Sequence, residues 1–426
     1  MTVSFHTLGC KLNFAETSTI SRLFTDNGYS RVKFGQPADV TVINTCTVTA
    51  QSDRKCRQVI NKAIKTSPEA LVVVIGCFAE HKAAEIAAIE GVDIVLGNKE
   101  KFNIIEHINN RQSSVVNHQS SLPFISSYSL FDRARSFLKV QDGCDYRCAY
   151  CIVPIVRGAS RNAPIVDVVE QAKNIAAQGI KEIVLTGVNI GDFGKTTGET
   201  FMQLLRALDT VDSVERIRIG SIEPNMITEE MIKYIADSKI YAPHFHMSLQ
   251  SGCNKILSLM GRLYTREQFA MNVALIHRYM PRAAVGADVI VGFPGETDSD
   301  FSETFDFIES LNIAYLHVFA YSERPGTKAV EMPDRVKSSI ADCRTKKLLK
   351  LSEEKRMLFY KQNIGQCLPV IFEQKTGSDN MTGYTDSYIR VEAAYYESVI
   401  GKTVLTEMIG ISESCNTGLI AFCQIR

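Results

Sequence analysis

The first hundred residues alternate short apolar runs with segments of helical periodicity. The apolar runs predict strands at 3–8, 40–44, 71–75 and 94–96. Between them, apolar positions repeat as on one face of a helix at 13–27, 53–65 and 80–90. The nearly continuous Val/Ile run at 71–75 is typical of a strand buried on both faces of a parallel sheet. This alternation predicts a doubly wound α/β domain over residues 1–105.

A second series of strands and helices follows between 134 and 363. The predicted strands lie at 137–140, 182–186, 216–219, 244–249, 284–291 and 315–321. The predicted helices lie between them, at 165–178, 201–208, 228–238, 266–279 and 298–311. Repeated strand–helix units of this kind build a barrel, and active sites in barrels form at the carboxyl ends of the strands.

Two other segments have their own patterns. Residues 106–133 are predicted to be a connector, because 112–129 is rich in Ser, Asn and Gln and has no periodicity. Short strands are predicted at 368–372, 388–391, 402–406 and 419–422, between Gly-rich turns. This pattern predicts a small all-β barrel over residues 364–426.

Composition changes this picture through the cysteines. The chain of 426 residues contains 12 of them, yet its N-terminus has no visible signal peptide and no apolar run is long enough to span a membrane. We therefore expect a cytoplasmic protein in a reducing compartment, whose thiols serve metal binding or catalysis. Its net charge is zero, so a nucleic-acid partner would have to be held by local patches.

Three cysteines follow the predicted strand at 137–140, at the spacing Cys-x3-Cys-x2-Cys. Thiolates select zinc, copper(I) or iron–sulfur clusters, and no second pair or nearby His completes a structural zinc site. Three thiolates would hold an iron–sulfur cubane with one iron open. The alternative is that they pack as small hydrophobic residues. The spacing resembles the signature of the radical S-adenosylmethionine (SAM) superfamily, in which the open iron binds SAM. The three residues are Cys144, Cys148 and Cys151.

Three more cysteines each come just after a predicted strand of the first domain. They are Cys10, Cys46 and Cys77. The carboxyl ends of parallel strands open on one edge of a sheet, so these thiols could converge on a second cluster. Any one of them could instead be a core cysteine, but the recurrence after three strands favours a shared site. Cys56 lies in the middle of a predicted helix, and we interpret it as non-ligating.

These loops, together with the stretches at 151–158, 249–252 and 286–297, resemble the methylthiotransferases, a radical-SAM family with two [4Fe–4S] clusters. The resemblance covers the whole chain. It implies that Cys10, Cys46 and Cys77 bind the auxiliary cluster and that the later triplet binds the SAM cluster. It also implies a partial (β/α)6 barrel, with the N-terminal domain capping it, and a C-terminal TRAM domain. Glu80 is a small departure, because the family pattern has Gln there.

The strand ends of the barrel supply candidate binding residues. Glycine allows close approach of the backbone to a cofactor, and a charged residue inside a strand needs a partner or faces the lumen. A surface or salt-bridge role is the alternative for each of them, and no catalytic side chain is assigned. The candidates for SAM binding are Gly187, Glu223, Gln250 and Asp288, and the candidates for contact with an anionic substrate are Arg157 and Arg161.

Within the family, the stretches at 7–13, 143–145 and 249–253 look most like one substrate branch. That branch adds the methylthio group to C2 of N6-threonylcarbamoyladenosine at position 37 of tRNA, beside the anticodon, and uses SAM as both radical source and methyl donor. The alternatives are isopentenyladenosine in tRNA, an aspartate of a ribosomal protein, or a non-catalytic iron–sulfur RNA-binding protein. The resemblance further implies an electron donor such as flavodoxin or ferredoxin, and a sulfur source.

The distribution of charge bears on RNA binding. From residue 365 onward there are four basic and seven acidic residues, so the predicted C-terminal barrel is not an obvious RNA-binding surface. This acidity favours the ribosomal-protein branch. The segment 335–361 has nine basic and three acidic residues. We hypothesise that this basic segment, with Arg157 and Arg161, contacts tRNA; a solvated charged helix is the alternative.

Overall fold

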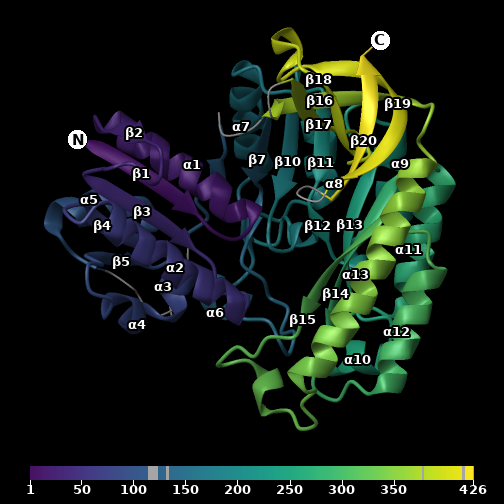
Figure 1. Ribbon diagram of the computed structural model, residues 1–426, viewed down its shortest axis with the longest axis horizontal. Helices are drawn as coiled ribbons and strands as arrows, with labels where there is room; N and C mark the ends of the chain where they lie inside the picture. The colour runs from purple at the N-terminus through teal and green to yellow at the C-terminus, as the bar shows by residue number, and fades with distance from the viewer. Residues whose placement is uncertain (114–122, 131–133, 377–378, 415–417, 426) are drawn as a thin grey trace.

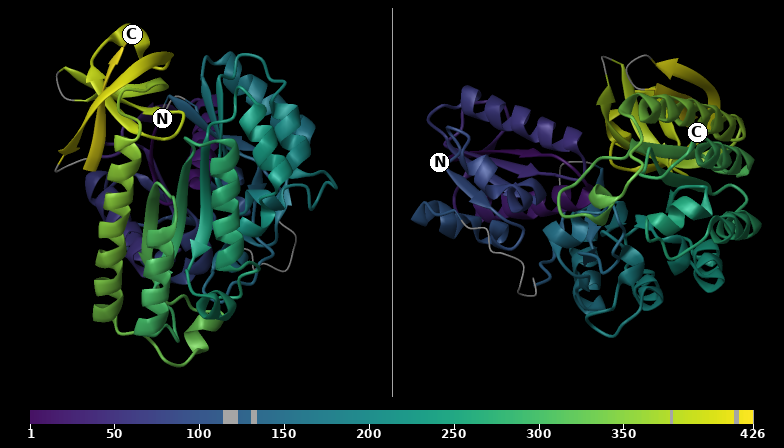
Figure 2. Two further views of the ribbon diagram at one scale, coloured as in Figure 1. Left: turned by 90° about the vertical axis from the view of Figure 1, so that its right-hand side faces the viewer. Right: turned by 90° about the horizontal axis from the view of Figure 1, so that it is seen from below.

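The computed structural model describes residues 1–113, 123–130, 134–376, 379–414 and 418–425. The chain forms three parts that lie against one another: an N-terminal α/β part, a central open barrel and a C-terminal β-barrel (Figure 1). A long helix, α13 (Ser338–Lys361), runs along the outside of the central barrel up to the C-terminal one (Figure 2). Much of the predicted connector, 114–122 and 131–133, lies outside the described residues.

The N-terminal part is a parallel sheet of five strands in the order β2-β1-β3-β4-β5. Separate apolar clusters pack on its two faces, which confirms the doubly wound prediction. The predicted helix at 80–90 is divided into two, because Lys82 leaves the helical conformation. The strands are β1 (Thr2–Thr7), β2 (Ser30–Val32), β3 (Val40–Thr45), β4 (Leu71–Gly76) and β5 (Ile94–Leu96), and the helices are α1 (Lys11–Asp26), α2 (Ala50–Thr66), α3 (Cys77–His81), α4 (Ala83–Ala87) and α5 (Ile104–Asn110).

The central barrel is built from two four-stranded sheets, β11-β10-β7-β6 and β12-β13-β14-β15. Gly220 joins β11 to β12, and a Cβ there would come within 2.6 Å of the carbonyl oxygen of Leu185. With β11 and β12 counted as one bent strand, all six predicted strands are present and pair in parallel. An additional strand, β6, pairs antiparallel with β7. The strands are β6 (Ser127–Tyr128), β7 (Arg135–Lys139), β10 (Glu182–Thr186), β11 (Arg216–Ile219), β12 (Ser221–Ile222), β13 (His244–Gln250), β14 (Ala284–Val291) and β15 (Tyr315–Ala320).

Helices cover the outer face of these strands, and the main apolar core lies between the two layers. The open side of the barrel faces the N-terminal part (Figures 1 and 2). Among the described residues, no helix is long and apolar enough to cross a membrane. The helices are α7 (Ile165–Ala177), α8 (Phe201–Leu208), α9 (Glu229–Asp237), α10 (Asn254–Leu259), α11 (Arg266–Tyr279), α12 (Asp298–Ser310) and α13 (Ser338–Lys361).

The C-terminal part is a closed barrel of five strands in the order β16-β17-β18-β20-β19, which confirms the predicted small β-barrel. Its β17 has the polar sequence NMTGYT, and the strand pattern therefore missed it. That this barrel is a TRAM domain, and that the parts divide at 105, 133 and 363, remain predictions. The strands are β16 (Cys367–Thr376), β17 (Asn380–Thr385), β18 (Arg390–Ala394), β19 (Thr403–Ser414) and β20 (Gly418–Ile425).

Candidate functional site

A cavity of about 620 Å³ lies where the N-terminal sheet edge meets the open side of the barrel. All six cysteines singled out in the sequence line it, as do the four predicted SAM-binding residues and Arg157. Arg161 is not among the lining residues. The structure therefore brings together side chains from two parts of the chain that are separated by up to 278 positions, from Cys10 to Asp288.

The N-terminal cysteines reach the cavity because neighbouring parallel strands end at the same edge. β1, β3 and β4 are adjacent, and Cys10, Cys46 and Cys77 follow their last residues within three positions. Close approach of these loops requires glycine at position 9. Gly9 has a φ of 106°, and a Cβ there would lie 2.7 Å from the Cβ of Cys46.

The second group of cysteines lies on a loop that a short ladder closes at its base. β8 (Gln141–Asp142) pairs with β9 (Arg161–Asn162), and the backbone N–H of Cys144 donates to the carbonyl oxygen of Gly158 at 3.0 Å. Within this loop, the short helix α6 (Val153–Arg157) follows the last cysteine of the triplet. The ladder fixes the start and the end of the loop, so the three thiols face the cavity in one constrained arrangement.

Hydrogen-bond donors already point at the sulfur atoms. Arg262 Nη1 donates to Cys148 Sγ at 3.0 Å, and the backbone N–H of Tyr146 donates to Cys144 Sγ at 3.4 Å. In the other group, Asn98 Nδ2 lies 3.7 Å from Cys77 Sγ. Such donors stabilise negative charge on sulfur, as thiolate ligands of an iron–sulfur cluster require.

The thiols form two groups, and within each group the thiols influence one another electrostatically. Burial raises the pKa of Cys46 to about 12, and the neighbouring Cys77 and Cys10 add to the rise. Burial raises the pKa of Cys151 to about 12, partly offset by the backbone at Val153, with Cys148 and Cys144 contributing. The raised pKa values of Cys46 and Cys151 favour their neutral thiols, and bound iron is the kind of charge that would deprotonate them. Two groups of three thiols therefore fit two iron–sulfur clusters.

The predicted SAM-binding residues form the barrel side of the cavity. Glu223 makes an ion pair with Arg262, the same residue that donates to Cys148. Gln250 lies at an irregularity in the pairing of β13 with β14 and has a φ of 64°. A side chain held in the left-handed region costs free energy and is found at functional sites more often than elsewhere. Arg262 was not identified from the sequence, since it lies beyond the end of the fourth predicted strand.

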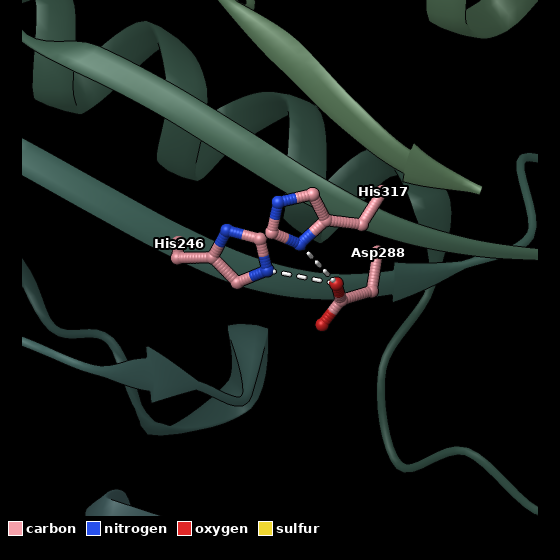
Figure 3. Close-up of side chains that lie close together, drawn as sticks. All are labelled: His246, Asp288 and His317. Carbon is pink, nitrogen blue, oxygen red and sulfur yellow. Dashed lines mark hydrogen bonds and ion pairs between the residues drawn. The ribbon is translucent and has the colours of Figure 1, made fainter. Parts of the chain in front are cut away.

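Asp288 is held by two histidines from the neighbouring strands of the barrel (Figure 3). Its Oδ1 lies 2.8 Å from Nε2 of His246 and 3.3 Å from Nδ1 of His317. Burial would raise the pKa of Asp288, but the two imidazoles keep it well below its usual value. The His246 ring also contacts the hydroxyl of Tyr315 at 3.1 Å. The sequence analysis predicted that Asp288, a charged residue inside a strand, needs a partner, but it did not identify the two histidines.

Arg157 and Arg161 lie in a buried ionic network between the N-terminal part and the barrel. Arg157 donates to Glu16, to Asn13 at 2.6 Å and to Asp142 at 2.9 Å. Arg161 donates to the second oxygen of Asp142 at 2.8 Å and to the carbonyl oxygen of Arg157 at 2.6 Å. Both side chains are thus bonded to protein groups beside the cluster loop, and their contact with a substrate remains a prediction.

Comparisons with known proteins agree with this architecture. Residues 138–308 match the Radical SAM superfamily, and residues 2–97 match a family described as "Uncharacterized protein family UPF0004". The solved structure of a radical S-adenosylmethionine methyltransferase, TsrM from Kitasatospora setae, with cobalamin and [4Fe-4S] cluster bound, has a TM-score of 0.56 at 16% identity. It covers 77% of this chain and 76% of its own, and shows the likeness of fold. This fold and site define a radical-SAM enzyme, for which an iron–sulfur cluster and SAM are the cofactors.

More specific relatives cover nearly the whole chain. The threonylcarbamoyladenosine tRNA methylthiotransferase MtaB of Bacillus subtilis (strain 168) is 41% identical over 98% of this chain and 96% of its own length. The enzyme of the same description from Aquifex aeolicus (strain VF5) is 38% identical over 95% and 99%. A tRNA-2-methylthio-N(6)-dimethylallyladenosine synthase of Syntrophotalea carbinolica is 33% identical over 89% and 90%. The chain belongs to the radical-SAM tRNA methylthiotransferase family.

Proposed function

We propose that this enzyme transfers a methylthio group to C2 of N6-threonylcarbamoyladenosine at position 37 of tRNA. The observation that carries the proposal is the single cavity lined by both groups of three cysteines. The relatives described as threonylcarbamoyladenosine tRNA methylthiotransferases support the choice of substrate, at 32–41% identity. SAM would serve as both radical source and methyl donor.

Two [4Fe–4S] clusters would be held by the two groups of cysteines, Cys10/Cys46/Cys77 and Cys144/Cys148/Cys151. When bound, they supply electron transfer to SAM and a carrier for the sulfur group. The chain's own residues orient the groups bound in the cavity and shield them from water. Arg262 links Cys148 to Glu223, and the Arg157 network seals the N-terminal part against the barrel. Exclusion of water around a reactive radical is the protein's part of such chemistry.

The tRNA anticodon loop would reach the cavity past the C-terminal barrel and α13. On α13, Lys346, Lys347 and Lys350 are exposed, which supports the proposed contact with phosphate. Arg344 is excluded from this surface, because it is buried and paired with Glu296 at 2.9 Å. Reversing the charge at Lys346 and Lys347 should weaken tRNA binding and reduce its salt dependence; unchanged binding would contradict this role. The electron donor, flavodoxin or ferredoxin, and the sulfur source belong to the same proposal.

A second substrate, dimethylallyladenosine, is favoured by the relative from Syntrophotalea carbinolica at 33% identity. The two substrates share the reacting carbon and differ in the group on N6. Their discrimination therefore depends on what surrounds that group and not on the clusters, and the same cysteines would serve either reaction.

The test compares one cysteine from each group, in protein reconstituted without oxygen. Cys148→Ala should lose both SAM cleavage and methylthiolation, whereas Cys10→Ala should lose methylthiolation and retain SAM cleavage. Each variant should bind about four iron atoms in place of about eight. Iron and sulfide analysis, release of 5′-deoxyadenosine and mass spectrometry of tRNA nucleosides are the measurements. Equal loss of SAM cleavage in both variants would contradict the division of labour, and Cys56→Ala serves as the control.

A further inference from the structure

A second pocket adjoins the cysteine cavity and shares Gly9 with it. It has a volume of about 160 Å³. All three parts of the chain contribute to its wall. The N-terminal part contributes the loop after β1 and the start of α1, the central barrel contributes β7, β10 and β11, and the C-terminal barrel contributes the turn between β17 and β18. The lining residues are Gly9, Lys11, Phe14, Arg135, Phe137, Val184, Arg218 and Tyr388.

The pocket carries positive charge that the protein does not neutralise. Arg135 is paired with Glu373 at 2.9 Å, and Arg218 with Glu182 at 2.9 Å. In the part of the chain that the structure describes, the ammonium group of Lys11 has no hydrogen-bond or ion-pair partner. Its side chain is accessible to water, although protein surrounds it. This cation is solvated and is available to pair with an anion that enters the pocket.

Two further features add to this positive field. Lys11 is the first residue of α1, whose first turn contains no acidic residue, so the positive end of the helix dipole faces the same region. The guanidinium of Arg218 lies 4.9 Å from the ring centre of Tyr388, and that of Arg135 lies 5.4 Å from it. Burial would raise the pKa of Tyr388, but these cations outweigh it and lower the pKa.

The remaining wall is apolar. Phe14, Phe137 and Val184 form one small hydrophobic cluster with Ala15, and all three reach the pocket. A bare phosphate gains nothing from such a surface, whereas an organic anion with a short hydrocarbon part can bury it there. The combination of a cationic rim and an apolar floor indicates a small carboxylate ligand.

We propose that this pocket binds the carboxylate of an amino-acid group attached to N6 of the substrate adenosine, and that Lys11 is the residue that determines this specificity. The proposal rests on the proposed function. The reacting carbon, C2, must face the auxiliary-cluster side of the cavity, where Cys10 lies. C2 and C6 both flank N1 of the adenine ring, so the N6 group lies on the same edge of the base as the reacting carbon, and the adjoining pocket begins one residue after Cys10. A threonylcarbamoyl group carries a carboxylate and a methyl group, whereas a dimethylallyl group carries no charge.

The experiment uses the reconstituted holoprotein and two synthetic anticodon stem-loops. One stem-loop carries threonylcarbamoyladenosine, and the other carries the same group with its carboxylate converted to a carboxamide. The native protein should prefer the carboxylate in kcat/KM by about 10- to 100-fold, the value of a charge-assisted hydrogen bond. Lys11→Met should abolish that preference through KM, and Lys11→Arg should restore part of it. Lys173→Met, on the exposed face of α7, is the matched control and should retain the full preference.

The outcomes separate the two proposals. If the native protein modifies neither stem-loop, the proposed function fails. If it modifies the carboxylate form and Lys11→Met keeps the preference, the pocket proposal fails alone. If Lys11→Met weakens both stem-loops equally and lowers the salt dependence of binding, Lys11 contacts phosphate, which also overturns the proposal. Iron analysis checks the neighbouring Cys10. If Lys11→Met binds less iron, the variant Arg135→Gln, on the opposite wall of the pocket, replaces it in the test. Arg135→Gln should reduce the preference for the carboxylate by a smaller factor, and an unchanged preference would contradict the pocket proposal.

Discussion

Two ionic networks hold the flanking parts of the molecule against the central barrel, and in each of them two carboxylates face a larger number of cations. The network beneath the N-terminal part has two carboxylates, Glu16 and Asp142, and four cations, Lys101, Lys139, Arg157 and Arg161. The network beneath the C-terminal barrel has two carboxylates, Glu182 and Glu373, and three paired cations, Arg135, Arg216 and Arg218; Lys11 lies beside it without an ion-pair partner among the described residues.

The two networks differ in what stands beside the excess of positive charge. In the first, burial would lower the pKa of Arg157, but Cys77, Glu16, Asp142 and Cys10 lie close to it and raise this pKa; the two thiols would become negative if they ligated a metal. The protein therefore supplies the missing anion itself. In the second, the neighbour of Lys11 is an open pocket. Buried positive charge needs compensation, and in the second network the proposed carboxylate ligand would add to the compensation that Glu182 and Glu373 give.

The largest effect is expected when the first network loses its central carboxylate. Glu16→Gln leaves Lys101, Lys139 and Arg157 without their shared partner in a fully buried site. The free energy of unfolding should fall by ~3–5 kcal/mol, as for other buried ion pairs that lose one member. Thermal and denaturant unfolding of the holoprotein measure it, with the exposed Glu170→Gln as control. A loss similar to that of the control would show that the network is not structural.

A smaller loss is expected at the corresponding carboxylate of the second network. Glu182→Gln should cost about 2–3 kcal/mol, because Arg216 and Arg218 retain carbonyl acceptors in the C-terminal barrel. Burial would raise the pKa of Glu182, but Arg218 and Arg216 lower it to about 2. A lowered folded-state pKa means that its stabilisation is present above pH 4.5 and is lost as the pH falls towards 2. The pH dependence of unfolding should therefore become shallower in this range in the variant; an unchanged slope would contradict the pairing.

Sequence patterns predicted the parts of this molecule that are local along the chain. The cluster loop is a motif within eight positions, and the strand-end rule predicted the meeting of Cys10, Cys46 and Cys77 because parallel strands share an edge. The division of the predicted helix at 80–90 and the polar strand β17 were not predicted, since local spacing does not reveal tertiary pairing. Both networks were missed for the same reason: Glu16 and Lys139 are 123 positions apart.

The smallest effect on stability is expected at Lys11, beside the second network, and the sharpest contrast is with Lys101 of the first. Lys101 is 1% exposed and donates to Glu16 and to Asn98, so Lys101→Met should destabilise the protein by about 3 kcal/mol. Lys11 has no such partner among the described residues and lies near Arg135 and Arg218, so Lys11→Met should change the free energy of unfolding by less than about 0.5 kcal/mol. Unfolding in the absence of RNA compares the two directly. An equal loss of stability in Lys11→Met and Lys101→Met would mean that the Lys11 ammonium group already has a partner in the folded protein. It would then not be available to bind a ligand.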